Sequence, residues 1–194
     1  HGYTRRNSES GTGLPSPLSA RQILWVNFFS DSFPAIAFAF ENADRNLRRK
    51  IFGAKRELVD KEMRFFILFI GVTTSVFLFV LYYFLLKIGY DLTLVKTFIF
   101  ISFATYSLFI TFSFRNLHEN IFKYNPFSNP YLLGGVAIGL VLTAAAVYLP
   151  ELSQLLGTVA LPARWLVNVG VVVFANVLVI EIGKALFISK KERS

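Results

Sequence analysis

An acidic residue, Asp31, lies near the middle of a mostly apolar stretch from Gln22 to Phe40, which is long enough to cross a bilayer. Asn27 precedes it by about one helical turn and Ser30 adjoins it. These side chains offer carboxylate, amide and hydroxyl oxygens, the ligands that hard cations prefer. A charged carboxylate at mid-membrane costs about 2.5–3.5 kcal/mol and therefore needs compensation. We predict that Asn27, Ser30 and Asp31 bind a cation.

Pro34 follows this group and should break the helix that carries it. Proline donates no backbone hydrogen bond, and its ring crowds the carbonyl group of Ser30. A broken helix at membrane depth frees carbonyl oxygens, as in many transporters. Two alternatives stay open for Asp31: a proton relay, or a packing role in which it pairs with a basic or amide group of a neighbouring helix.

The elements that position these residues are membrane helices. Hydrophobic residues make up 54% of the 194 residues and charged residues only 16%, which disfavours a soluble enzyme and a nucleic-acid binder. Cysteine is absent, so thiolate chemistry is excluded. The predicted fold class is all-α: a polytopic bundle of five transmembrane helices, the first broken near Pro34. The predicted spans are residues 22–40, 65–86, 97–114, 131–149 and 165–187.

Basic residues predict the orientation of the bundle. Of the 20 Lys and Arg residues, eight lie between Glu41 and Arg64, and six more fall in the later links and tail on the same side. The positive-inside rule makes that side cytoplasmic. The amino end is then outside and the carboxyl end is cytoplasmic. We expect residues 1–13 to be a disordered or foreign leader and residues 14–194 to form the membrane domain.

Several further residues have structural interpretations. Ser19 is a candidate N-cap for the first helix. Gly134, Gly135 and Gly139 give the fourth span a small face suited to close packing. Glu181 and Lys184 are spaced as an intrahelical ion pair near the inner end of the last span. Asn168 and Asn176, with serines and threonines of other spans, are candidates for hydrogen bonds between helices.

The stretch LPSPLSARQILWVNFFSDSFPAIAFAFEN resembles the outer loop and sixth transmembrane helix of P-type cation-transporting ATPases, especially the calcium-pump-like group. KRELVDKEM is similar to the inner loop before the seventh helix, and RNLHENIFKYNPFSNPYLL to the loop between the eighth and ninth. LPELSQLLGTVALPARW resembles the outer loop before the tenth helix. The likeness runs from Leu14 to Lys191, so the five spans match helices six to ten of the family.

The resemblance implies roles for particular residues. Asn27 and Asp31 match the family's ion-binding asparagine and aspartate, and Ser30 stands where calcium pumps usually have threonine. At about Ser107, calcium pumps of the sarcoplasmic-reticulum type carry a glutamate ligand that this chain lacks. The family's fifth helix, with further ligands, is also missing before Leu14. One calcium ion, another divalent cation, or a monovalent ion or proton remain as alternatives to a two-calcium site.

The sequence thus predicts the membrane part of an ATP-driven cation pump, with calcium as the first choice of ion. The chain has no Asp-Lys-Thr-Gly phosphorylation motif and no loop able to hold a nucleotide domain, so it should hydrolyse no ATP alone. ATP and magnesium belong to the complete pump. The expected partners are membrane lipid and the missing amino-terminal half, not nucleic acid, and the plasma membrane is the expected location. The rivals are an independent small carrier or proton-coupled channel, and a noncatalytic membrane subunit.

Overall fold

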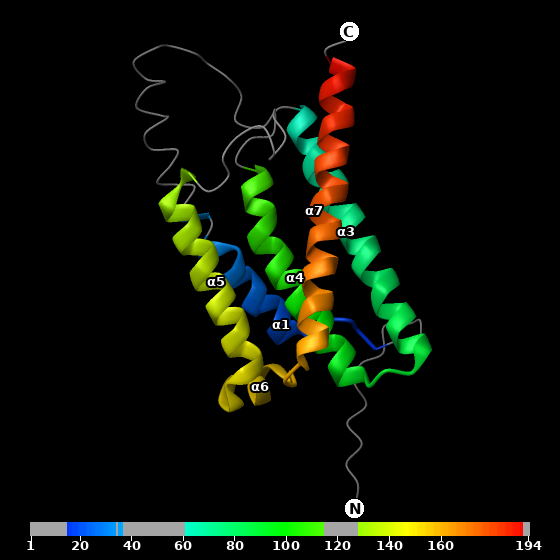
Figure 1. The fold of residues 1–194 in the computed structure, drawn as a ribbon, viewed down its shortest axis with the longest axis vertical. Helices are drawn as coiled ribbons and strands as arrows, with labels where there is room; N and C mark the ends of the chain where they lie inside the picture. The colour runs from blue at the N-terminus through cyan, green and yellow to red at the C-terminus, as the bar shows by residue number, and fades with distance from the viewer. Residues whose placement is uncertain (1–14, 34, 37–60, 115–127, 192–194) are drawn as a thin grey trace, which may run out of the picture.

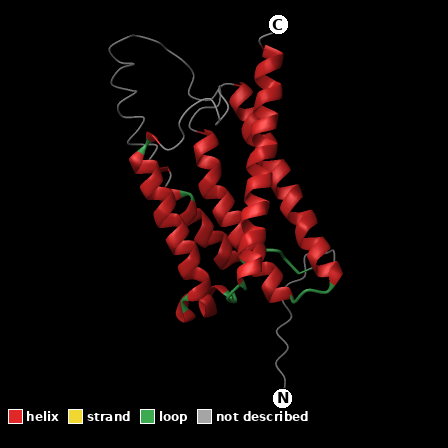
Figure 2. Cartoon of the chain, in the orientation of Figure 1, coloured by secondary structure: helices red, strands yellow, loops and turns green. Residues whose placement is uncertain are grey.

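The computed structural model describes residues 15–33, 35–36, 61–114 and 128–191, and these residues are mostly helical, with no strand among them (Figure 2). This part of the chain confirms the all-α fold class. In chain order the helical elements are α1 (Ala20–Trp25), the π-helix η1 (Val26–Ser30), α3 (Lys61–Ile88), α4 (Leu92–Phe114), α5 (Pro130–Tyr148), α6 (Pro150–Leu156) and α7 (Ala163–Lys191).

Four of the predicted spans are confirmed as long apolar helices. The helices able to cross a membrane by length and composition are Leu68–Ile88, Leu92–Ser113, Pro130–Tyr148 and Ala163–Ala185. The third span begins earlier than expected because Asp91 caps it, its carboxylate accepting a hydrogen bond from the Leu94 N–H at 2.9 Å. The first predicted span, 22–40, is helical over α1 and η1. Pro34 and residues 37–40 lie outside the described residues, so the predicted break at Pro34 stays a prediction.

Helix α4 is the centre of the bundle. It packs against α7, α5 and α3, and its side chains Phe100, Ala104 and Leu108 are fully buried. Figure 1 shows α4 between α5 and α7, with α1 and η1 crossing the bundle at a slant. Because η1 contacts both α4 and α5, its buried residues Val26 and Ser30 are held against the interior of the bundle.

Glycines set the closest approaches between helices. A Cβ atom at Gly139 on α5 would collide with the side chain of Leu108 on α4, and one at Gly183 on α7 would come 2.7 Å from Phe69 of α3. At Gly134, in contrast, no atom of the described residues lies within 4 Å of an added Cβ. The small-face interpretation of the fourth span is therefore confirmed at Gly139, whereas no close approach is seen at Gly134 among the described residues.

A short helix that the sequence analysis missed, α6, connects α5 to α7. Proline occupies its first position and Gly157 ends it in the left-handed conformation at φ 65°. The carbonyl oxygens of Leu155 and Leu156 accept hydrogen bonds from the side chains of Arg21 (2.8 Å) and Gln22 (3.2 Å). The start of α1 is thereby fixed to the end of the bundle that bears α6.

Candidate ion-binding site

The helix that carries the predicted ligands begins at a complete capping box. The Ser19 hydroxyl accepts a hydrogen bond from the Gln22 N–H at 3.3 Å, and the Gln22 side-chain oxygen accepts one from the Ser19 N–H at 2.9 Å. This confirms Ser19 as the N-cap. Together with the contacts of Gln22 to α6, it gives α1 a defined start about two turns before Asn27.

The backbone changes from an α-helix to a π-helix just where the predicted ligands lie. The Asp31 N–H donates to the Val26 carbonyl, five residues earlier, at 3.1 Å. A π-turn widens the helix locally and is frequent at functional sites. Val26 and Ser30 are both fully buried within it. The irregularity therefore begins before Pro34, which itself lies outside the described residues.

The predicted ligands differ in their environment. Ser30 is fully buried, and its hydroxyl oxygen has no hydrogen-bond partner within the described part of the chain. Asn27 and Asp31 are exposed on the surface of the described residues. The Asn27 carbonyl oxygen accepts a hydrogen bond from the Ser32 hydroxyl at 3.4 Å. The three residues thus share one short helical segment, but Ser30 points inward where the other two do not.

Ser107 of α4 joins this group. Its hydroxyl lies within hydrogen-bonding reach of the Asp31 carboxylate. The sequence analysis included Ser107 among the candidates for hydrogen bonds between helices and noted the glutamate that this position lacks, but it did not count the serine as a site residue. The signal was available, because the family resemblance marked the position as one that faces the ion. Chemically, the cluster offers one carboxylate and two hydroxyl oxygens, which suits a hard cation better than a soft one.

No group of three or more His, Cys, Asp or Glu side chains gathers among the residues that the structure describes. A divalent ion usually draws on more than one carboxylate or on several carbonyl oxygens. A complete divalent-cation site would therefore need ligands beyond Asp31 and the two serines.

A second buried polar cluster joins α7 to α4. The Lys184 Nζ lies 2.8 Å from the Glu181 carboxylate and donates to the Ser113 carbonyl oxygen at 3.1 Å. The predicted ion pair is confirmed, and both side chains are buried in the bundle, at 0% and 3% exposure. Asn176 also differs from expectation, since its amide donates to the Val172 carbonyl of its own helix at 3.0 Å. Thr74, in contrast, does link helices by donating to the Tyr106 hydroxyl at 2.8 Å.

Four apolar helices of membrane-spanning length among the described residues indicate an integral membrane protein. Comparison with known proteins is more specific. Residues 15–186 match the family described as "Cation transporting ATPase, C-terminus". The chain belongs to this family.

Individual relatives are calcium pumps by name. The chain is 29% identical over 163 residues to the "Calcium-transporting ATPase" of Bacillus subtilis (strain 168), a match that covers 81% of this chain and 18% of that protein. It is 32% identical over 155 residues to the mouse "Calcium-transporting ATPase type 2C member 2", and this match covers 77% of this chain and 16% of the mouse protein. The identity to the Saccharomyces cerevisiae "Calcium-transporting ATPase 1" is 27%, and this match covers 75% of this chain and 16% of the yeast protein. The matches thus cover 16–18% of the length of these relatives.

Proposed function

We propose that this chain is the carboxyl-terminal membrane part of an ATP-driven calcium pump, in which Asn27, Ser30 and Asp31 supply oxygen ligands to the transported ion. The observation that carries the proposal is the π-helix at Val26–Ser30. It supports an ion site because Ser30, whose buried hydroxyl has no hydrogen-bond partner among the described residues, directly precedes Asp31. Ser107 of α4 brings a second helix close to the Asp31 carboxylate.

Calcium is the proposed cargo for two reasons. The relatives described above are named as calcium transporters. The donor atoms are all oxygens, and a carboxylate with hydroxyl and amide oxygens is the set that calcium prefers. Backbone oxygens near the break can contribute too, since Pro34 has no N–H to offer the Ser30 carbonyl.

The proposed mechanism divides the work between this chain and the rest of the pump. The exposed side chains of Asn27 and Asp31 would meet further ligands on helices of the amino-terminal half. Phosphorylation of a cytoplasmic domain there would change the geometry of the irregular segment and so alternate access to the ion. This chain would bind and release calcium while ATP and magnesium act elsewhere in the complete pump, with the amino end outside and the carboxyl end cytoplasmic.

The test is the substitution Asp31→Asn in the complete pump. Loss of the negative charge should abolish calcium-stimulated phosphorylation by ATP, or raise the calcium concentration it requires by more than about tenfold, the change in binding that 1.4 kcal/mol produces. Phosphorylation by inorganic phosphate, which needs no bound calcium, should persist and shows that the variant is folded.

Asp91→Asn is the matched control. Asp91 caps α4 through its side-chain oxygen, and asparagine caps helices equally well. Its calcium dependence should therefore equal that of the unmodified pump. Unchanged calcium stimulation in Asp31→Asn would refute the ligand assignment. Stimulation of the unmodified pump by protons in place of calcium, lost in Asp31→Asn, would favour the proton relay.

A further inference from the structure

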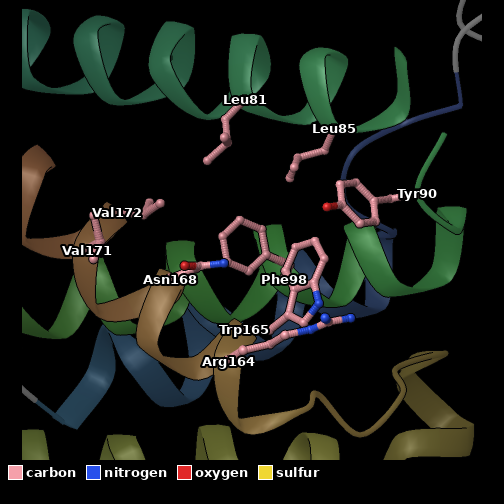
Figure 3. A pocket seen from close by; sticks show the side chains of 9 residues that line it. All are labelled: Leu81, Leu85, Tyr90, Phe98, Arg164, Trp165, Asn168, Val171 and Val172. Atoms are coloured by element: carbon pink, nitrogen blue, oxygen red, sulfur yellow. The ribbon is translucent and has the colours of Figure 1, made fainter. Parts of the chain in front are cut away.

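A pocket of about 320 Å³ opens between α3, α4 and α7, separate from the ion site. Figure 3 shows its lining, with the rings of Tyr90, Phe98 and Trp165 close together. Trp165 meets Tyr90 and Phe98 edge to face, with ring centroids 5.1 and 5.0 Å apart. This volume falls in the range of pockets that hold small ligands.

The pocket lies where the membrane surface meets the hydrocarbon. Tyr90 follows the end of α3 and Trp165 is near the start of α7, and amphipathic rings of this kind concentrate at the interface. The lining continues inward to Leu81, about 10 Å from the end of α3, and to Val172, about 13 Å from the start of α7. Its inner walls are leucine and valine side chains, which suit an acyl chain.

A cation stands at the mouth of this apolar pocket. Arg164 is exposed, lines the pocket, and makes no hydrogen bond or ion pair within the described ranges of the chain. Asn168, one turn further along α7, adds an exposed amide. A guanidinium group binds a phosphate oxygen pair through two parallel hydrogen bonds.

We infer that this pocket binds an anionic phospholipid from the leaflet on the α6 side of the bundle, with its phosphate on Arg164 and one acyl chain against Leu81, Leu85 and Val172. The positive charge of Arg164 favours a headgroup with a net negative charge. The apolar lining is deep enough to hold an acyl chain, which a free anion lacks, so the pocket favours a lipid. The site is independent of the proposed calcium site, because Arg164 and the pocket lining share no residue with it.

The experiment uses the complete protein, purified and analysed by native mass spectrometry with phosphatidylglycerol or phosphatidylcholine of identical acyl chains. The unmodified protein should retain phosphatidylglycerol about fivefold better, as expected for one basic side chain at a membrane surface. Arg164→Gln should remove this preference and Arg164→Lys should keep most of it. Lys87→Gln is the matched control, since Lys87 is exposed at the end of α3 but does not line the pocket, and it should keep the preference.

A second measurement needs no variant. Phosphatidylglycerol with a photoactivatable acyl chain should cross-link to the peptides that contain Leu85 and Val172 in excess over the phosphatidylcholine analogue. Equal retention of both lipids, equal loss in the Lys87→Gln control, or a cross-link pattern without these peptides would each overturn the inference. The last result would mean that protein, such as another helix of the complete pump, fills the pocket.

Discussion

Replacing Lys184 with methionine should strongly destabilise the bundle. The lysine Nζ is fully buried, 2.8 Å from the Glu181 carboxylate and 3.1 Å from the Ser113 carbonyl oxygen. Methionine fills similar space but removes the cation that lies 2.8 Å from the buried Glu181 carboxylate. Removing one partner of a buried ion pair costs about 3–5 kcal/mol, and the lost hydrogen bond to α4 adds about 1 kcal/mol.

The double substitution Glu181→Met with Lys184→Met separates the charge effect from packing. Because neither charge of the pair then remains, the double variant leaves no buried charge at these positions, and losing the bond to Ser113 with some packing should cost about 1–2 kcal/mol. It should therefore be more stable than the Lys184→Met variant, although it carries one more substitution. If the two substitutions caused independent packing losses, the double variant would instead be less stable than Lys184→Met.

The assay is thermal unfolding of the detergent-solubilised complete protein, followed by the fraction that remains monodisperse after heating. The melting temperature should fall furthest for Lys184→Met, less for the double variant, and hardly at all for Lys87→Met, because Lys87 is exposed. The reasoning fails if the melting temperature of the double variant is equal to or lower than that of Lys184→Met. That result would mean that an unbalanced buried charge is not the cause of the destabilisation.

Two further pairs of substitutions test the packing of α5 and the capping of α1 in the same assay. Gly139→Val should lower the free energy of unfolding by about 1–3 kcal/mol because its side chain would collide with Leu108 of α4, whereas Gly134→Ala, which faces open space, should have little effect or raise it. Equal effects of the two would contradict the close approach of α5 and α4. Ser19→Ala should cost about 1 kcal/mol because it removes the N-cap of α1, and Ser19→Asp, which preserves the cap, should restore most of the loss. A Ser19→Ala variant as stable as the unmodified protein would show that the contacts with α6 alone hold the start of α1.

The sequence was sufficient to predict the long helices because bilayer thickness fixes how many apolar residues a span needs. The sequence analysis placed the ends of the helices less well. Helix α4 begins before Lys96 because Asp91 caps it, and hydropathy does not detect a capping residue. Helix α6 was missed although its signal was readable: Pro150 at the first position and Gly157 directly after the last.

Features that depend on contacts between helices could not be predicted in the same way. The spacing of Glu181 and Lys184 predicts an ion pair, but whether the pair is buried depends on how α7 is rotated against α4. The π-turn at Val26–Ser30 likewise depends on the contacts of η1 with α4 and α5, and no propensity of these residues specifies it. Sequence identified which residues could do chemistry, and packing decided which of them face the interior.

The same distinction explains why Ser30 and Asp31 lie in different environments although they are adjacent. A helix turns through a large angle between neighbouring residues, so one can face the bundle while the other faces away from it. Ser30 is buried against this chain's own helices, while Asp31 reaches the edge of α4 at Ser107 and is otherwise exposed. A site divided between two halves of a protein is compatible with this arrangement: the buried Ser30 hydroxyl lies on the inner side of the segment, and Asp31 presents its charge to the other half. The exposed carboxylate therefore fits a site completed by further helices better than it fits an independent five-helix carrier, which would have to enclose Asp31 by itself.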